Sequence, residues 1–157
     1  MSVFAAVMIL ITTLVTSFIS GIFGMAGGIV LMAVLVALVS VATAMIVHGG
    51  IQMFANGYRA FLLREHVDWR VFAIYCIGAA IGVAALFFVQ WTPDKQTLYL
   101  LLGLTPLLVW LPKERLHLDI QRTDHAVVAG FLVQGLNTLA GVAGPLLDLF
   151  FVRAEMT

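Results

Sequence analysis

Six apolar runs make up most of the chain, and their lengths constrain the fold more than any other feature. They are Val3 to Phe18, Ile29 to Val39, Val41 to Leu63, Val71 to Gln90, Thr97 to Leu111 and Ala126 to Phe151. Only 10% of the 157 residues are charged, whereas soluble domains have about 25%. A soluble protein of this length could not bury so much apolar surface. The sequence therefore predicts an all-α, polytopic transmembrane helical bundle in contact with lipid.

The basic residues predict how the bundle is oriented. The connectors 64–70 and 113–124 contain several Arg and Lys residues, and two predicted spans separate them. The two connectors should therefore lie on the same side of the membrane, which the positive-inside rule makes cytoplasmic. Asp94 and Lys95 should face the opposite compartment. Hydropathy does not decide whether the short run Ile29 to Val39 crosses the membrane or turns back.

Two glycine-rich segments interrupt the apolar runs. "GMAGGIVLM", from Gly24 to Met32, aligns with "GVAGPLLDL", from Gly141 to Leu149, and both contain Gly-x-Ala-Gly. Each segment follows one apolar run and precedes another, so we predict an internal repeat and broken helices. The first repeat would cover residues 1–120, and residues 121–157 would begin a second, incomplete repeat. The repeat is inverted if the run before residue 40 counts as a crossing, because five segments then precede the second copy.

Paired glycine breaks are the best sequence indication of a binding site in a secondary transporter. A broken helix leaves free N–H groups and partial positive charge at the start of its second half, where an anion can bind. The alternative interpretation is that the glycines only allow helices to pack closely. The candidate substrate-binding residues in the breaks are Gly24, Gly27, Gly28, Gly141, Gly144 and Pro145.

Polar residues inside the apolar runs extend this candidate site. His48, Gln52 and Asn56 recur every four residues and so share one helix face. Gln134 and Asn137 precede the second break and could line the same cavity. Intramembrane polar residues usually face the bundle interior or a water-filled path, where they would donate hydrogen bonds to an anion. Hydrogen bonding between helices is the alternative.

Charged residues near the apolar runs are few. Asp148 is a candidate coupling-proton site; pairing with Arg153 or a position near the membrane interface are the alternatives. Arg59 is the deepest basic residue, and we expect it to extend to the cytoplasmic surface, with attraction of the substrate as the alternative. The site would then offer an anion only partial charges, which favours singly charged over doubly charged substrates.

Three segments resemble the TauE/SafE family of membrane permeases, which is implicated in the export of sulfite and organosulfur anions. They are "GIFGMAGG", "LLREHVDWRVFAIYCIGAAIGVAALFFV" and "GFLVQGLNTLAGVAGPLLDLFF". The likeness covers nearly the whole chain, although each motif is degenerate and dominated by glycine. Family members are usually longer and have two homologous halves, whereas this sequence stops soon after the second motif. The first motif continues as "GGIVLM", where a proline often follows in the family.

The resemblance and the residues together predict a secondary permease for a small anion, such as sulfite or an organosulfur or organic acid, in the bacterial plasma (inner) membrane. The alternative is a non-transporting, truncated membrane subunit that packs against a partner membrane protein. A homo-oligomer or a partner could supply the missing half. Basic and acidic residues number eight each, so no nucleic-acid partner is expected. No catalytic, metal or nucleotide motif is recognisable, and we expect neither an enzyme nor a cofactor.

Overall fold

A computed structural model describes residues 3–23, 26–88, 93–110 and 118–151, and within these ranges the chain is helical, without strands. The α-helices are α1 (Val3–Phe23), α2 (Ala26–Leu38), α3 (Val41–Leu62), α4 (Trp69–Phe87), α5 (Lys95–Leu104), α7 (Thr123–Ala140) and α8 (Gly144–Phe151). Two short 3-10 helices, η1 (Arg64–His66) and η2 (Thr105–Trp110), follow α3 and α5. The all-α prediction is confirmed, and each apolar run forms one helix or two consecutive helices.

The long helices present apolar side chains to their surroundings. Two segments, Val3–Ile22 and Trp69–Phe87, are long and apolar enough to cross a membrane, and only 11% and 17% of them are buried inside the molecule. Phe4 and Phe18 of α1 are 70% and 72% exposed. In water this surface would be unfavourable, whereas a bilayer solvates it. At 13 residues, α2 is about 20 Å long and too short to span the ~30 Å hydrocarbon core.

Polar residues fix several helix starts. The side chain of Ser40 accepts a hydrogen bond from Thr43 N at the start of α3. Asp94 accepts one from Thr97 N, 3.1 Å away, at the start of α5. Hydrogen bonds from Thr97 hold the pKa of the Asp94 carboxyl below its usual range. These side chains satisfy N–H groups that have no partner within the helix.

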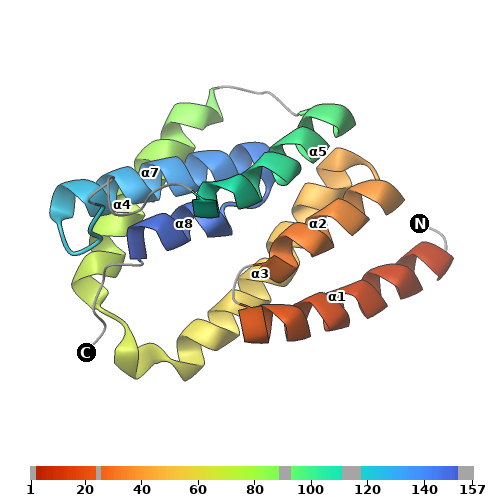
Figure 1. Ribbon diagram of the computed structural model, residues 1–157, viewed down its shortest axis with the longest axis horizontal. Helices are drawn as coiled ribbons and strands as arrows, with labels where there is room; N and C mark the ends of the chain where they lie inside the picture. Colours follow the sequence, from red (N-terminus) through yellow and green to blue (C-terminus); the bar gives the residue numbers. More distant parts are fainter. Residues whose placement is uncertain (1–2, 24–25, 89–92, 111–117, 152–157) are drawn as a thin grey trace.

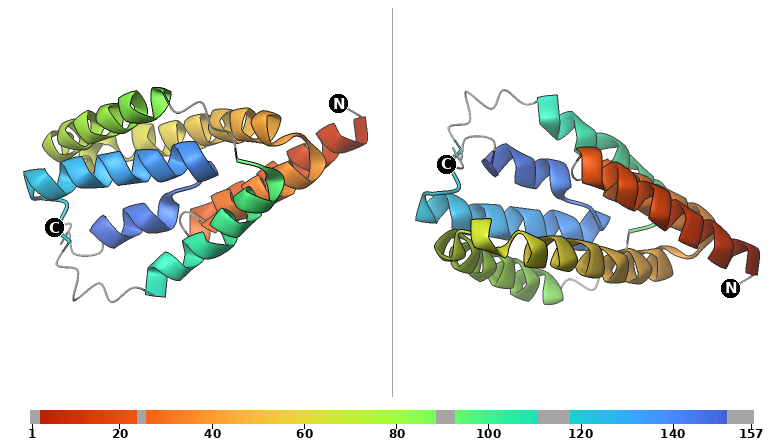
Figure 2. Two further views of the ribbon diagram at one scale, coloured as in Figure 1. Left: turned by 90° about the horizontal axis from the view of Figure 1, so that it is seen from above. Right: turned by 90° about the horizontal axis from the view of Figure 1, so that it is seen from below.

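The helices form two groups, α1 to α3 and α4, α7 and α8, and α5 contacts both α2 and α7 (Figure 1). Within the first group, α2 turns back along α1 and packs against it. In the second group, α8 turns back from the end of α7 in the same way. The run Ile29 to Val39 therefore does not continue the direction of the first helix. Figure 2 shows both turns from two further directions.

Glycines allow the close contact between α4 and α7. A Cβ atom at Gly78 would collide with the carbonyl oxygen of Val127, and one at Gly130 would collide with the carbonyl oxygen of Tyr75. Only hydrogen in place of a side chain lets the two backbones approach this closely. A separate apolar cluster, centred on Met32 and Leu35, joins α2 to α3, α5 and α7.

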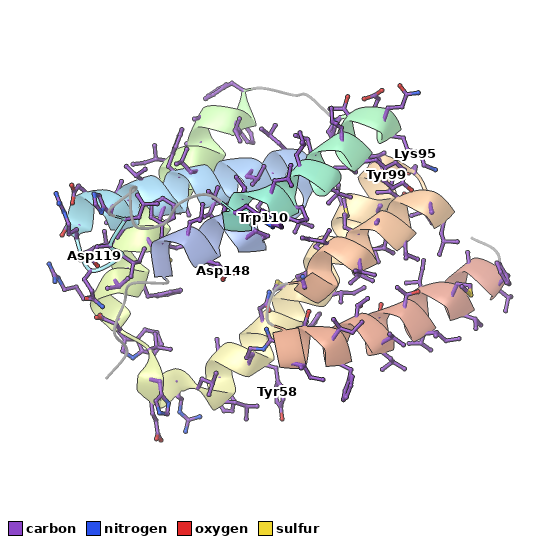
Figure 3. All side chains as sticks on the ribbon, in the orientation of Figure 1. Tyr58, Lys95, Tyr99, Trp110, Asp119 and Asp148 are labelled. Atoms are coloured by element: carbon purple, nitrogen blue, oxygen red, sulfur yellow. The ribbon has the colours of Figure 1, made fainter. Side chains whose placement is uncertain are left out.

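The connector 64–70 and the described part of the second basic connector, residues 118–124, lie at the same end of the molecule. Arg70, at the start of α4, donates from Nη2 to the Thr123 hydroxyl at the start of α7, 3.5 Å away. Asp119, in the connector before α7, lies at the opposite end from Lys95 (Figure 3). This is the relative placement that the positive-inside argument requires. Which end faces the cytoplasm stays a prediction.

Candidate functional site

A polar, partly open cavity of about 450 Å³ lies between α3 and the junction of α7 with α8. It follows α3 from His48 to Arg59, which is about 16 Å at 1.5 Å per residue. The cavity therefore reaches from the middle of α3 to the end that carries the basic connectors. Its polar and glycine lining consists of Ser20, His48, Gly49, Gln52, Asn56, Arg59, Tyr75, Gln134, Asn137, Gly141 and Gly144.

The first glycine break contacts this cavity's wall through Gly28. His48 is 4% exposed, and its Nε2 lies 3.1 Å from the Gly28 carbonyl oxygen. A carbonyl oxygen only accepts, so Nε2 carries the hydrogen in this contact. A Cβ atom at Gly28 would lie 2.5 Å from Nε2 of Gln52. Gly28 is thus packed directly against His48 and Gln52. These two residues and Asn56 form a polar stripe along α3.

The second break forms part of the wall itself. Gly141 ends α7 with φ at +72°, and its N–H donates to the Asn137 carbonyl at 2.8 Å. This left-handed conformation at a helix end favours glycine. At the start of α8, the N–H groups of Leu146 and Leu147 both donate to the Ala143 carbonyl. Pro145 has no N–H, so Gly144 provides the first-turn amide of α8 that has no partner among the described residues.

Six of the predicted binding residues line this one cavity, although they come from two helices and a junction far apart in the sequence. The six are His48, Gln52, Asn56, Asn137, Gly141 and Gly144. Gly27 and Gly28 instead line an adjoining cavity of about 20 Å³ between α1, α2 and α3. Pro145 is buried behind the wall, and Gly24 lies outside the described residues. Asp148 is exposed on α8 and is not among the lining residues (Figure 3).

Gly27 has a packing role. A Cβ atom there would collide with the Thr16 carbonyl oxygen and with Oγ of Ser20. Because one of these obstacles is backbone, the neighbouring helix would have to move. For Gly27, the structure supports the close-packing interpretation of the glycine cluster.

Ser20 and Arg59 line both cavities. The sequence did not indicate Ser20 as a site residue, and it favoured a surface position for Arg59. Arg59 is half-buried and donates from Nη1 to Oδ1 of Asn56, 3.4 Å away. The signal was its position three residues after Asn56, which continues the helix face begun by His48. Ser20 directly precedes the first glycine cluster, but nothing in its spacing connects it to the stripe.

A helical bundle whose outer faces are apolar and whose helices border a polar, partly open cavity has the features of an integral membrane protein. The family follows from a comparison with known protein families. The model of the sulfite exporter TauE/SafE family matches residues 9–154, and the chain belongs to that family. The family is one of membrane transporters for sulfite and related anions. Comparisons with curated proteins and with solved structures find no significant match.

Proposed function

We propose that the protein is a secondary permease for a small anion, sulfite or an organosulfur or organic acid, in the bacterial inner membrane. The proposal rests on one observation: the polar stripe of α3 and the second glycine break face each other across one cavity. Polar groups at membrane depth are costly unless they line a water-filled path or bind a solute. This cavity gives them that setting.

The lining fits an oxyanion in chemistry and in size. Gln52, Asn56, Gln134 and Asn137 present amide N–H donors, and the Ser20 hydroxyl adds another. At about 30 Å³ per water molecule, 450 Å³ holds about 15 waters. A small anion and part of its hydration shell would fit, and so would a larger organic acid.

Helix direction supports an inverted repeat, with residues 1–120 as the first unit and 121–157 as the beginning of the second. In Figures 1 and 2, α1 and α7 run in opposite directions, and so do α2 and α8. Each pair is joined at one copy of Gly-x-Ala-Gly. In this arrangement the two breaks approach the cavity from opposite helix pairs, as in transporters whose sites lie between inverted repeats.

A second candidate function is a non-transporting subunit that packs against a partner. Asn56 and Asn137 are exposed at the cavity although they lie in membrane helices. In this case the open side of the cavity would face a partner protein or a second copy of the chain instead of water, and that partner would cover these amides.

Flux measured in liposomes distinguishes the two functions. In the permease, Gln52→Ala and Asn137→Ala should each lower sulfite flux at least severalfold while the protein remains monodisperse. Gln121→Ala is the matched control, because Gln121 is exposed in the connector before α7 and does not line the cavity. A parent protein that neither transports nor binds anions, but co-purifies stoichiometrically with another membrane protein, would support the subunit instead. Equal flux in all three variants would refute the cavity as the site.

A further inference from the structure

Arg59 is the one permanently charged side chain among the described residues that line the larger cavity, and no carboxylate is among them. His48, the other titratable basic group, has its Nε2 engaged with Gly28. The wall therefore has a net positive charge that comes from a single guanidinium. An anion that enters the cavity meets this charge without a competing acidic group in the lining.

Two other arginines that the structure describes at this end, Arg64 and Arg122, interact with different partners. Arg64 lies over the ring of Phe61, 4.7 Å from its centroid. Arg122 forms an ion pair with Asp124 at 2.9 Å. Arg59 donates to the neutral amide of Asn56, and no ion pair to it occurs within the part of the chain that the structure describes. Its charge is thus not neutralised by a carboxylate there.

The position of Arg59 suits an incoming solute. It lies near the end of α3, on the side of the basic connectors, and borders both the larger cavity and the small cavity beneath Gly27 and Gly28. A guanidinium has five N–H donors in a rigid fork. The contact with Asn56 uses one of them and leaves the others for a ligand.

We propose that Arg59 recognises the substrate by binding two oxygens of an oxyanion with its guanidinium fork, at the connector end of the cavity. The inference rests on the proposed permease function and narrows its substrates to anions with at least two oxygens on one centre, as in sulfite, sulfonates and carboxylates. Arginine matches such groups through two parallel hydrogen bonds, which a lysine ammonium cannot form. Asn56 acts as a positioning residue for this fork.

The test is sulfite flux into proteoliposomes, with KM and maximal rate determined separately. Arg59→Gln should raise KM about 10- to 100-fold, the loss expected for one charge-assisted, bidentate contact. Arg59→Lys keeps the charge but not the fork and should raise KM by a smaller factor, with a steeper dependence on ionic strength. Arg64→Gln removes a more exposed positive charge from the same end of α3 without touching the cavity, and it should leave KM unchanged.

The outcomes separate this inference from the function on which it rests. A parent protein without sulfite flux and without anion binding refutes the permease itself. A parent that transports, with Arg59→Gln at the parental KM, refutes the role of Arg59 and leaves the permease intact. If Arg59→Gln does not fold, Arg59→Lys decides, because a parental KM in that folded variant excludes bidentate recognition. An equal rise of KM in Arg64→Gln would assign the effect to general surface charge.

Discussion

Replacing Gly141 with alanine tests whether the second break requires the backbone that the structure gives it. Gly141 has φ at +72°, where an L-residue with a Cβ atom is strained by about 1–2 kcal/mol. The new Cβ atom would also lie 2.8 Å from Cε of Met32, which is fully buried. Because the end of the Met32 side chain can move, this contact should destabilise the protein by about 1 kcal/mol, the low end of the range for overpacking. Alanine recovers about 0.4–1 kcal/mol by restricting the unfolded chain. We expect a net loss of about 2 kcal/mol.

The measurement is the free energy of unfolding in mixed micelles during titration with SDS, followed by tryptophan fluorescence. The matched control is Gly57→Ala, where the Cβ atom would meet nothing within 4 Å. Gly57 lies inside α3, so the same substitution should stabilise by up to about 1 kcal/mol. The two variants are thus expected to differ in sign.

A double-mutant cycle separates backbone strain from steric contact. In a Met32→Ala background, Gly141→Ala should cost only about 1 kcal/mol, since the strain remains and the contact is gone. A parental or raised stability of Gly141→Ala would refute the left-handed helix end. A cost that is the same in both backgrounds would show that Met32 does not pack on the break.

Three further predictions concern packing, capping and the first break. Gly130→Ala should strongly reduce the yield of monodisperse protein in size-exclusion chromatography, because its Cβ atom collides with the backbone of Tyr75, and normal yield would contradict the α4–α7 contact. Asp94→Ala should lower Tm at pH 7. The pKa of Asp94 is lowered in the folded protein, so the stabilisation from its capping is present above about pH 4 and is lost as the pH falls through the lower folded pKa. A Tm difference between the parent and the variant that grows in acid would contradict this. Gly28→Ala should displace the Gln52 amide and raise the KM for sulfite at nearly unchanged Tm, whereas a large loss of Tm would assign Gly28 to packing.

Helix positions could be predicted because their determinants are local. The apolar runs, the capping side chains of Ser40 and Asp94 and the stop before Gly141 are all visible within a few residues of each helix end. The alignment of His48, Gln52 and Asn56 on one wall follows from helical periodicity alone. The turn of α2 back along α1 could not be predicted from the sequence, because it depends on packing against α1 and not on the hydropathy of the run.

The roles of adjacent glycines could not be separated from sequence. Gly27 and Gly28 have the same local pattern and differ by one position on the helix. That difference of about 100° turns Gly27 toward the backbone of α1 and Gly28 toward His48 and Gln52 of α3. Which neighbour each one meets is set by the placement of two other helices. Spacing predicted that the cluster matters, and the tertiary structure divides it into a packing position and a position at the polar stripe.

The source of positive charge in the cavity likewise could not be predicted from the sequence, because it depends on the tertiary structure. Glycine breaks led us to expect partial charges from helix starts and a preference for singly charged anions. At the second break, Ala143 accepts the N–H groups of Leu146 and Leu147, and Pro145 has none, so few amides are left for a ligand. Arg59 meanwhile borders the same cavity with a full charge. A full charge in a half-buried site attracts an anion more strongly than half a charge at a helix end, and offsets more of the cost of desolvating a second negative charge. Selectivity between singly and doubly charged forms should therefore depend on Arg59 more than on the helix starts.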